Sequence, residues 1–569
     1  MQSELGQPNN KQSLDKKSNS SGLLSSSVIV GAMTMLSRFA GLARDVVLAR
    51  FFGAGDSADA FFVAFKIPQF LRRLFAEGAF SQAFIPVLAE YKDDRDEQGE
   101  LAAVKNLINA VAGVLSGVLL VLTLLVIVAA PWIAYIFAPG FSGIPEKFEL
   151  TVSMLRITFP YLLLISLTGM AAGILNSYGR FWVPAITPVL LNASLITAAL
   201  WWSPKLSEPV FALAWAVFIA GFAQLLFQLP FLAKINLLPK PVWDLQHPGV
   251  RKVLKLMVPA LFGVSVSQIN LLLDTVLASF LPAGSVSWLY YSDRLVELPL
   301  GVFGIAIATV MLPSLSSIHF SGSSADNHIA RENFVSALDW SLRCIVVIAL
   351  PATIGLFMLA EPILILLFQY QAMTPSDISM AALSLQAYSV GLFAFMAIKV
   401  LATGYYAQQD MKTPVRIGII AMIANMVLNL IFVYIAHRFW QVGHVGLALA
   451  TSFSACLNAW LLYRGLGSSK ALKGSVRPLV SRPSLVIFAK VICAAFLMIV
   501  MLIFTQPSIT HWLEAGFWQR LQGVCLLIVG AGFVYIAAAI VLGVRPAHFR
   551  FKMNTSDGAR QNGEEHDGE

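Results

Sequence analysis

Long apolar segments recur along the whole chain, and they constrain its fold more than any other feature. A helix needs about 20 consecutive apolar residues to cross the hydrocarbon core of a bilayer. Of the 569 residues, 57% are hydrophobic and 12% are charged, a composition that soluble domains of this size do not have. We therefore predict an all-α polytopic membrane protein with about fourteen transmembrane helices. The predicted spans are residues 25–52, 58–90, 106–136, 151–178, 184–202, 209–233, 254–281, 286–317, 338–368, 383–408, 414–436, 443–464, 483–505 and 520–543.

The distribution of lysine and arginine predicts how the chain crosses the membrane. Basic residues crowd one set of flanks between the spans, whereas the other set has few beyond Lys147, Lys205, Arg438 and Arg520. Because cytoplasmic loops carry the excess of positive charge, we expect both termini to be cytoplasmic. The net charge of +8 then reflects loop orientation, and no nucleic-acid partner is expected. Segments 1–21 and 546–569 are predicted to be disordered cytoplasmic tails.

Nothing in the sequence indicates a cofactor or a catalytic centre. The four cysteines lie in apolar segments and form neither a CxxC motif nor a Cys/His metal spacing. No loop carries a Walker A, HExxH or GxSxG motif. We therefore predict a transporter, and any energy that it uses must come from an ion gradient or the membrane potential. A membrane-embedded glycosyl- or phosphotransferase is the rival class. It would need an interfacial carboxylate or histidine cluster, which His437 and His444 alone do not supply.

Ionisable residues interrupt the apolar pattern most densely in residues 37–91. Inside a bilayer each such group costs several kcal/mol unless it faces water, a ligand or a partner. At 3.6 residues per turn, one stripe of the second span carries Asp59, Lys66, Arg73 and Glu77. Arg73 and Glu77 also have the spacing of a helical ion pair. The alternative is that these charges lie near helix ends, extend to the interface and pair with one another.

Arginine rather than lysine occupies four positions that interrupt the apolar spans. They are Arg38, Arg44, Arg72 and Arg294. A guanidinium group binds phosphate through two parallel hydrogen bonds and keeps its charge. Several such groups around one cavity would suit a pyrophosphate or another polyanion, whereas an exporter of cations would need carboxylates and aromatic side chains. An anionic substrate is therefore indicated, but its identity is not.

The span at 286–317 carries a second group of charges. Asp293 and Glu297 have the same sign and are four residues apart, which is unfavourable unless a cation lies beside them. Arg294 is adjacent in sequence but points about 100° away. We interpret these residues as part of a pathway; an interfacial ion cluster is the alternative. Asp274, in the preceding span, could help to hold Na⁺ or relay a proton, although polar packing between helices is the commoner explanation.

The second and eighth spans resemble each other, which indicates an internal repeat. Setting Pro86 against Pro313 places Lys66 against Asp293, and the turn at 176–184 matches the turn at 406–414 in length and closing proline. Both pairs lie six spans apart, so the two halves have the same orientation in the membrane. We predict two pseudo-symmetric six-helix bundles, residues 22–235 and 250–466, around a central cavity. A further helix pair, residues 482–545, comes after a basic linker and lies outside the repeat.

Three sequence stretches are similar to one known family. They are SRFAGLARDVVLARFFGAGDSADAFFVAFKIPQFLRRLFAEGAFSQAFIPVLAEYK, SVSWLYYSDRLVELPLGVFGIAIATVMLPSLS and YYAQQDMKTPVRI. They resemble the MurJ (MviN) family of bacterial lipid II flippases, within the multidrug/oligosaccharidyl-lipid/polysaccharide exporter superfamily. The resemblance covers roughly residues 23–545 and implies two six-helix lobes and a helix pair whose groove holds the lipid chain.

The resemblance implies a function in cell-wall synthesis. A member of this family moves lipid II, an undecaprenyl chain joined by pyrophosphate to a disaccharide-pentapeptide, from the cytoplasmic to the periplasmic leaflet of the inner membrane. Its partners would be lipid II and membrane lipids, and we expect a monomer. A flippase for another undecaprenyl-pyrophosphate-linked glycan is the alternative.

The resemblance also assigns roles to individual residues. It implies that the substrate is bound by Arg38, Arg44, Asp59, Arg72 and Arg294, and it extends to Glu77 and Ser287. The remaining charged positions are candidates for gating or ion pairing: Asp45, Lys66, Arg73, Asp293 and Glu297. Some family members bind Na⁺ through carboxylate and asparagine ligands in the second lobe, and Asp274 is the candidate for such a ligand here.

Overall fold

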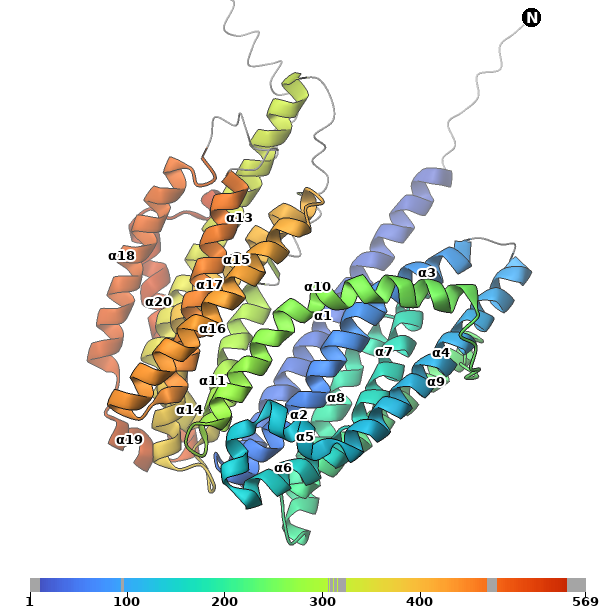
Figure 1. The fold of residues 1–569 in the computed structure, drawn as a ribbon. Helices are drawn as coiled ribbons and strands as arrows, with labels where there is room; N and C mark the ends of the chain where they lie inside the picture. Colours follow the sequence, from blue (N-terminus) through green and yellow to red (C-terminus); the bar gives the residue numbers. More distant parts are fainter. Residues whose placement is uncertain are drawn as a thin grey trace, which may run out of the picture. The chain divides into compact units, whose positions relative to one another are not determined.

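The protein is helical throughout the part that the structure describes. The computed structural model describes residues 11–93, 97–304, 306–307, 311, 315, 324–467 and 478–549. These ranges contain no β-strand (Figure 1), which confirms the predicted all-α class. The side chains of some helical residues, Glu77 among them, lie outside this description.

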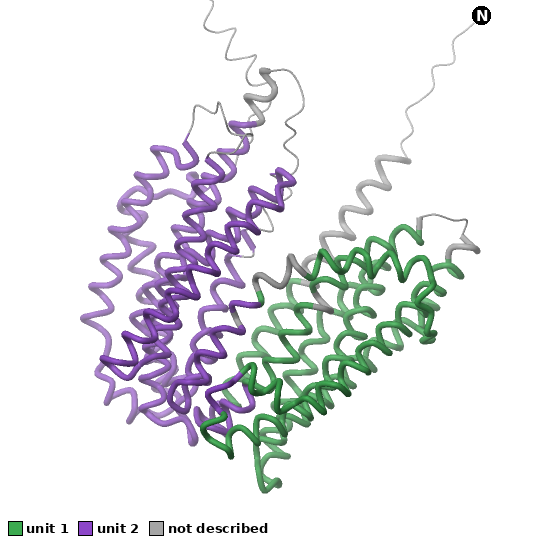
Figure 2. Tube along the Cα trace, in the orientation of Figure 1, with its two compact units in different colours: residues 1–48, 63–137, 142–268 green, residues 49–62, 138–141, 269–569 purple. Residues whose placement is uncertain are grey.

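The chain divides into two compact units, which are described separately (Figure 2). Unit 1 comprises Met1–Leu48, Val63–Phe137 and Ser142–Gln268. Unit 2 comprises Ala49–Phe62, Ala138–Phe141 and Ile269–Glu569. Boundaries between the units fall inside four helices, so each of these contributes residues to both units: α1 (Lys11–Phe52), α2 (Asp56–Arg72), η2 (Pro139–Gly143) and α10 (Pro248–Ser279).

The helices up to the middle of the chain are α1 (Lys11–Phe52), α2 (Asp56–Arg72), η1 (Arg73–Phe80), α3 (Ser81–Asp93), α4 (Glu97–Val128), α5 (Ala130–Phe137), η2 (Pro139–Gly143), α6 (Pro145–Thr158), α7 (Tyr161–Ser177), α8 (Trp182–Thr197), η3 (Ala198–Trp202), η4 (Ser203–Lys205), α9 (Phe211–Lys234) and α10 (Pro248–Ser279). The later helices are α11 (Ser285–Pro299), η5 (Leu300–Gly304), α13 (Ser324–Met358), α14 (Ala360–Phe368), α15 (Pro375–Ala407), α16 (Lys412–Trp440), α17 (Gly443–Gly467), α18 (Arg482–Thr505), α19 (Ile509–Glu514), α20 (Phe517–Val541) and η6 (Pro546–Phe549).

Local sequence signals set where several helices begin. Pro145 occupies the first turn of α6, where its missing N–H leaves no intrahelical bond unmade. At the start of α15, Thr374 and Asp377 form a capping box in which each side chain accepts from the other residue's backbone N–H. Ser481 caps α18 in the same position, by accepting from the backbone N–H of Ser484.

Five helices of each unit occur in the same order and have corresponding neighbours. In unit 1, a long helix (α4) is followed by a short one (α5), and α7 packs against α4 and α9 while α8 packs against α9. In unit 2, a long helix (α13) is followed by a short one (α14), and α15 packs against α13 and α17 while α16 packs against α17. Equivalent helices therefore have equivalent neighbours, as the predicted repeat requires.

A π-helix interrupts the equivalent span of each half. The offset that sets Pro86 against Pro313 also sets Arg73, the first residue of η1, against Leu300, the first residue of η5. A π-helix has more residues per turn than an α-helix, so it rotates the helical segment after it relative to the segment before it. The predicted stripe from Asp59 to Glu77 assumed an unbroken α-helix, and the π-helix changes the register of its last members.

The two turns that matched in sequence have the same backbone geometry. In the first, Gly179 has φ of +72° and the N–H of Arg180 donates to the carbonyl of Leu175 at 2.8 Å. In the second, Gln409 has φ of +59° and the N–H of Asp410 donates to the carbonyl of Tyr405 at 3.0 Å. Both turns therefore end a helix with the same left-handed cap.

The helix pair α18 and α20 packs on α13 and α14 of unit 2. Asp339 of α13 accepts from the hydroxyl of Ser484 at 2.7 Å and from Arg343 at 2.8 Å. Arg343 also donates to the carbonyl of His548 at 2.7 Å, which ties the chain after α20 to the same helix. Arg520, at the start of α20, is buried and donates to the carbonyls of Trp512 and Leu513.

Ten helices in the described part are long and apolar enough to cross a membrane, so this is a multi-pass membrane protein. Each of the ten coincides with one predicted span. The other four predicted spans fall on α1, on α2 with η1 and α3, on α10, and on α11 with η5. The total of about fourteen remains a prediction.

The predicted tails are described only in part. Residues 1–10 and 550–569 lie outside the described ranges, and residues 546–549 form η6. Residues 11–21, which we expected to be disordered, continue α1. Adding a residue to an existing helix is far less costly than starting one, so a polar segment can extend the helix that comes after it.

The two matched turns yield a first prediction. Gly179→Ala should lower the free energy of unfolding by about 1 kcal/mol, because a left-handed φ is unfavourable for a residue with a Cβ. A Cβ at Gly179 meets no other atom within 4 Å, so the backbone is the only source of the effect. Gln409→Gly should raise stability by a similar amount. Thermal unfolding of the purified protein in detergent measures both, and shifts in the same direction would contradict the assigned turn geometry.

Candidate functional site

A buried ion pair on α1 is hydrogen-bonded to α8 in unit 1. Arg44 and Asp45 of α1 are 6% and 1% exposed. Arg44 donates to Oδ1 of Asp45 from Nε at 2.9 Å and from Nη2 at 2.7 Å. Its Nη1 donates to Oδ1 of Asn192 on α8 at 3.0 Å. The guanidinium group is therefore held on two sides, by a carboxylate and by a neutral amide.

This arrangement keeps a charge inside an apolar helix bundle. Removing one partner of a buried ion pair leaves a charge uncompensated and costs about 3–5 kcal/mol. Asp45 therefore stabilises Arg44 in the position that the structure shows. A polyanion that reached Arg44 would offer its guanidinium group the same kind of bidentate contact.

The other two arginines of unit 1 that were predicted to bind the substrate are Arg38 and Arg72. Arg38 is half-buried on α1, six residues before Arg44. Arg72 is half-buried and is the last residue of α2, directly before the π-helix. Such π-helical turns often occur at functional sites.

A second cluster surrounds the beginning of α11 in unit 2. Asp59 of α2 is 1% exposed and its carboxylate accepts three hydrogen bonds. Oδ2 accepts from the N–H of Gly284 at 2.8 Å, and Oδ1 accepts from the N–H and the hydroxyl of Ser287 at 2.9 and 2.6 Å. Asp59 thus caps α11 from another helix, where its negative charge also complements the positive end of the helix dipole.

The shape of the chain at Gly284 makes this contact possible. Gly284 has φ of +93° and precedes the first residue of α11. A Cβ at this position would lie 2.7 Å from the ring of Trp288, so glycine is required both by the backbone and by the close approach.

Two more hydrogen bonds and a stacked pair of aromatic rings fix the same end of α11. The indole N–H of Trp288 donates to Asp377 at 3.0 Å, and the hydroxyl of Tyr291 donates to the carbonyl of Gly53 at 3.1 Å. The ring of Phe62 stacks on that of Tyr290 with a centroid distance of 4.0 Å. The corner between α1 and α2 is therefore bound to α11 within unit 2.

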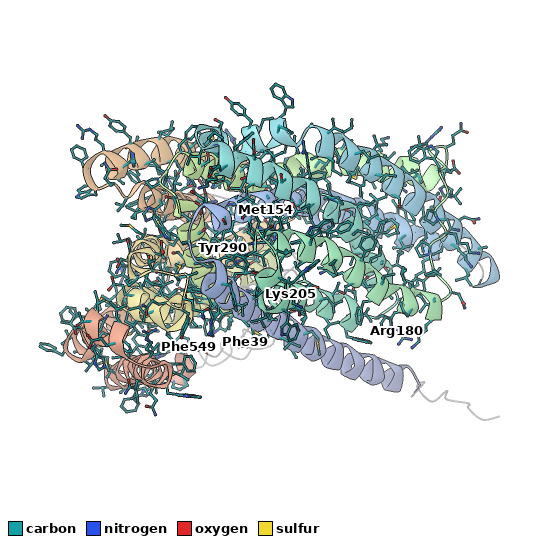
Figure 3. The ribbon with its side chains drawn as sticks, turned by 90° about the horizontal axis from the view of Figure 1, so that it is seen from below. Phe39, Met154, Arg180, Lys205, Tyr290 and Phe549 are labelled. Atoms are coloured by element: carbon teal, nitrogen blue, oxygen red, sulfur yellow. The ribbon has the colours of Figure 1, made fainter. Side chains whose placement is uncertain are left out.

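Arg294 lies one turn further along α11. Its Nη1 donates to Oε2 of Glu297 at 2.7 Å, and its guanidinium carbon lies 5.0 Å from the ring centroid of Tyr290, the residue labelled in Figure 3. Asp293 is exposed. Arg294 is thus the cation beside Glu297, and the ring of Tyr290 adds a cation–π contact.

Asp274 takes part in a polar cluster rather than a recognisable metal centre. It accepts a hydrogen bond from Asn429 of α16 at 2.8 Å, and Asn429 also donates to Asn425 at 2.9 Å. Among the described residues, no group of three or more His, Cys, Asp and Glu side chains could hold a metal ion. The cluster fits polar packing between α10 and α16, and a metal role for Asp274 remains a prediction.

The structure brings some of the predicted residues together and leaves others untested. It joins Asp59 to Ser287, Arg44 to Asp45, and Arg294 to Glu297. Lys66 and Arg73 are half-buried, and the side chain of Glu77 lies outside the described part. Arg38, Arg44 and Arg72 belong to unit 1 and Arg294 to unit 2, so their sharing of one cavity stays a prediction.

Sequence reasoning missed three residues that complete these clusters. Asn192 interrupts an apolar span and could have been noticed as an intramembrane amide. Asn429 could have been found in the same way. Gly284 carried no signal by itself, because its role depends on a carboxylate more than two hundred residues away in the sequence.

The fold and these buried charges define a class of protein. A polytopic helical protein with an internal repeat, and with ionisable groups held inside its helices, is a membrane transporter.

Comparisons with known proteins identify the family. A family model described as lipid II flippase MurJ matches residues 48–520. A probable lipid II flippase MurJ from Haemophilus influenzae is 47% identical over 529 residues, which cover 91% of this chain and 100% of the relative. The Vibrio cholerae counterpart is 48% identical over 531 residues, covering 92% and 97%. The chain belongs to the lipid II flippase MurJ family.

Solved structures agree with this assignment. A lipid II flippase MurJ in an inward closed conformation matches with a TM-score of 0.72 and 25% identity, covering 90% of this chain and 100% of that chain. An inward-facing MATE family multidrug resistance transporter of the MOP superfamily matches with a TM-score of 0.61 and 16% identity. That match covers 79% of this chain and 99% of the other, and it shows the likeness of fold alone.

The Asp59 cluster yields a second prediction. Asp59→Ala should lower the free energy of unfolding by about 2–3 kcal/mol, because it leaves buried N–H groups of α11 without an acceptor. Asp59→Asn should cost less, since one amide oxygen can still accept. Ser57→Ala, an exposed position on the same helix turn, is the matched control and should have almost no effect. Thermal unfolding in detergent measures all three, and equal effects of the two Asp59 variants would argue against the capping role.

Proposed function

We propose that the protein moves lipid II from the cytoplasmic to the periplasmic leaflet of the inner membrane by alternating access. Membership of the family over residues 48–520 carries this proposal, together with relatives at 47% and 48% identity that are called probable lipid II flippases. The protein acts in cell-wall synthesis as a transporter and not as an enzyme.

The substrate's pyrophosphate is bound by arginine side chains. Arg38, Arg44 and Arg72 supply guanidinium groups from unit 1, and Arg294 supplies one from unit 2. Guanidinium groups suit this task because they stay charged and bind phosphate oxygens in pairs. The observation that supports this role is that Arg44 is buried and is held by Asp45 and Asn192. When the substrate binds, its phosphate replaces the Asp45 carboxylate as the anionic partner of Arg44.

The remaining ionisable residues stabilise particular conformations of the cycle. Asp59 and Ser287 fix α2 to α11 in the conformation described here. Asp45 and Glu297 neutralise Arg44 and Arg294 when no substrate is bound. Lys66, Arg73, Glu77 and Asp293 contribute further ion pairs as the helices move.

The architecture proposed for this function has about fourteen membrane spans in two six-helix bundles, with a cavity for the substrate's head group. The helix pair α18 and α20 supplies an apolar groove for the undecaprenyl chain, and a single copy of the chain suffices.

Substitution of two arginines tests the substrate role. Arg44→Gln and Arg294→Gln should each lower the rate of lipid II translocation at least about tenfold, because each loses a charge-assisted bidentate contact with phosphate. Lysine at either position should restore only part of the rate, because an ammonium group is a point charge. A leaflet-accessibility assay for lipid II in reconstituted vesicles measures translocation.

Arg180→Gln is the matched control for this experiment. Arg180 is an exposed arginine in the turn after α7, and its substitution should leave translocation unchanged. Normal translocation by both Arg44→Gln and Arg294→Gln would refute the proposed role. Depleting the protein from cells should make lipid II accumulate, and accumulation of a different undecaprenyl-pyrophosphate-linked glycan would favour the alternative substrate.

The predicted orientation can be tested separately. Fluorescent protein fusions at either terminus should fluoresce, and alkaline phosphatase fusions at the same points should be inactive, because both termini are expected to be cytoplasmic. An active phosphatase fusion at either terminus would show that the number of spans or the orientation is wrong.

A further inference from the structure

Asn192 is a buried amide that makes contact with α1 through both of its polar atoms. It lies on α8 and is 5% exposed. Its Oδ1 accepts from Nη1 of Arg44 at 3.0 Å, and its Nδ2 donates to the carbonyl of Ser37 at 3.3 Å. One side chain thus fixes the backbone of α1 and, two turns later, the end of the Arg44 side chain.

We propose that Asn192 is a positioning residue that holds the guanidinium group of Arg44 in the orientation in which it binds the pyrophosphate of the substrate. This inference rests on the proposed function, because it gives Asn192 a role only through Arg44.

Asp45 and Asn192 bind different edges of the Arg44 guanidinium group. Asp45 binds the edge formed by Nε and Nη2, and Asn192 binds Nη1. Two contacts at different edges fix both the position and the plane of the guanidinium group, which a single contact would leave free to rotate. A planar, pre-oriented fork loses little conformational freedom when it binds phosphate oxygens.

The neutrality of the amide matters as well as its geometry. Asp45 already balances the charge of Arg44, and a second carboxylate at position 192 would give the cluster a net negative charge. Such a cluster would repel a pyrophosphate group. An asparagine offers an acceptor oxygen without that charge, so it can orient Arg44 while leaving its attraction for an anion intact.

The competing explanation is that Asn192 only packs α8 against α1. Thr187 provides a matched control for this possibility. It lies on the same helix, is 4% exposed, and accepts a hydrogen bond from Gln228 at 3.0 Å while donating to the carbonyl of Val183. It is therefore a buried polar side chain of α8 whose hydrogen bonds go to Gln228 and Val183 rather than to α1.

A double-mutant cycle separates the two explanations. The affinity of the full-length protein in detergent for undecaprenyl pyrophosphate is measured for the unmodified protein, Asn192→Leu, Arg44→Gln and the double variant, with the unfolding temperature of each. Asn192→Leu should weaken binding about tenfold, a free-energy change of about 1.4 kcal/mol. In the Arg44→Gln background the same substitution should change affinity by less than about twofold, because residues that act as a unit are not additive. Thr187→Val should leave affinity unchanged.

Each outcome decides one question. Unchanged affinity of Arg44→Gln would refute the proposed role of the arginine, and with it this inference. Weaker binding by Arg44→Gln but not by Asn192→Leu would refute the positioning role and leave the proposed function standing. Equal losses from Asn192→Leu in both backgrounds would show that Asn192 only packs the helices. If Asn192→Leu does not fold, Asn192→Ser, which is too short to reach Arg44, replaces it in the same cycle.

Discussion

The structure depends on neutralising charges within helices that are otherwise apolar. A lone guanidinium or carboxylate in such surroundings is costly, whereas a paired and hydrogen-bonded one is tolerated. Arg44 is held by Asp45 and Asn192, and Asp59 is held by two backbone N–H groups and one hydroxyl. One cluster involves α1 and the other α2, and each of these helices contributes residues to both units. A transporter can use such pairs because exchanging one partner for another costs far less than losing it.

The internal repeat gives the two units corresponding helices and corresponding irregularities. Equivalent helices in the two units have equivalent neighbours, and the π-helices η1 and η5 begin at equivalent positions. Arg72 directly precedes the first π-helix, and Arg294 lies on the helix that leads into the second. The duplicated scaffold therefore presents a cationic side chain near the same irregular point in each half, although the residues themselves are not equivalent.

Much of the fold could be predicted from the sequence, because membrane spans are defined by length and apolarity alone. All ten helices that meet these conditions coincide with predicted spans, and the turn at 176–184 and its counterpart at 406–414 have the shared geometry that their sequences suggested. The partners of the charged residues were harder to predict. Asp59 and Ser287 are 228 residues apart in the sequence, and Arg44 and Asn192 are 148 residues apart. The periodicity of apolar residues along a helix carries no information about contacts between such distant residues. The π-helices could not be predicted from the sequence pattern either, because the stripe from Asp59 to Glu77 was derived with the 3.6 residues per turn of an α-helix.

A structure of the protein with lipid II bound tests most directly whether Arg44 and Arg294 bind the pyrophosphate, as we propose. We expect phosphate oxygens within charge-assisted hydrogen-bond distance, about 2.7–2.9 Å, of guanidinium nitrogens of Arg44 and Arg294, with Arg44 partly released from Asp45. A pyrophosphate group bound elsewhere, with both ion pairs intact, would contradict this proposal.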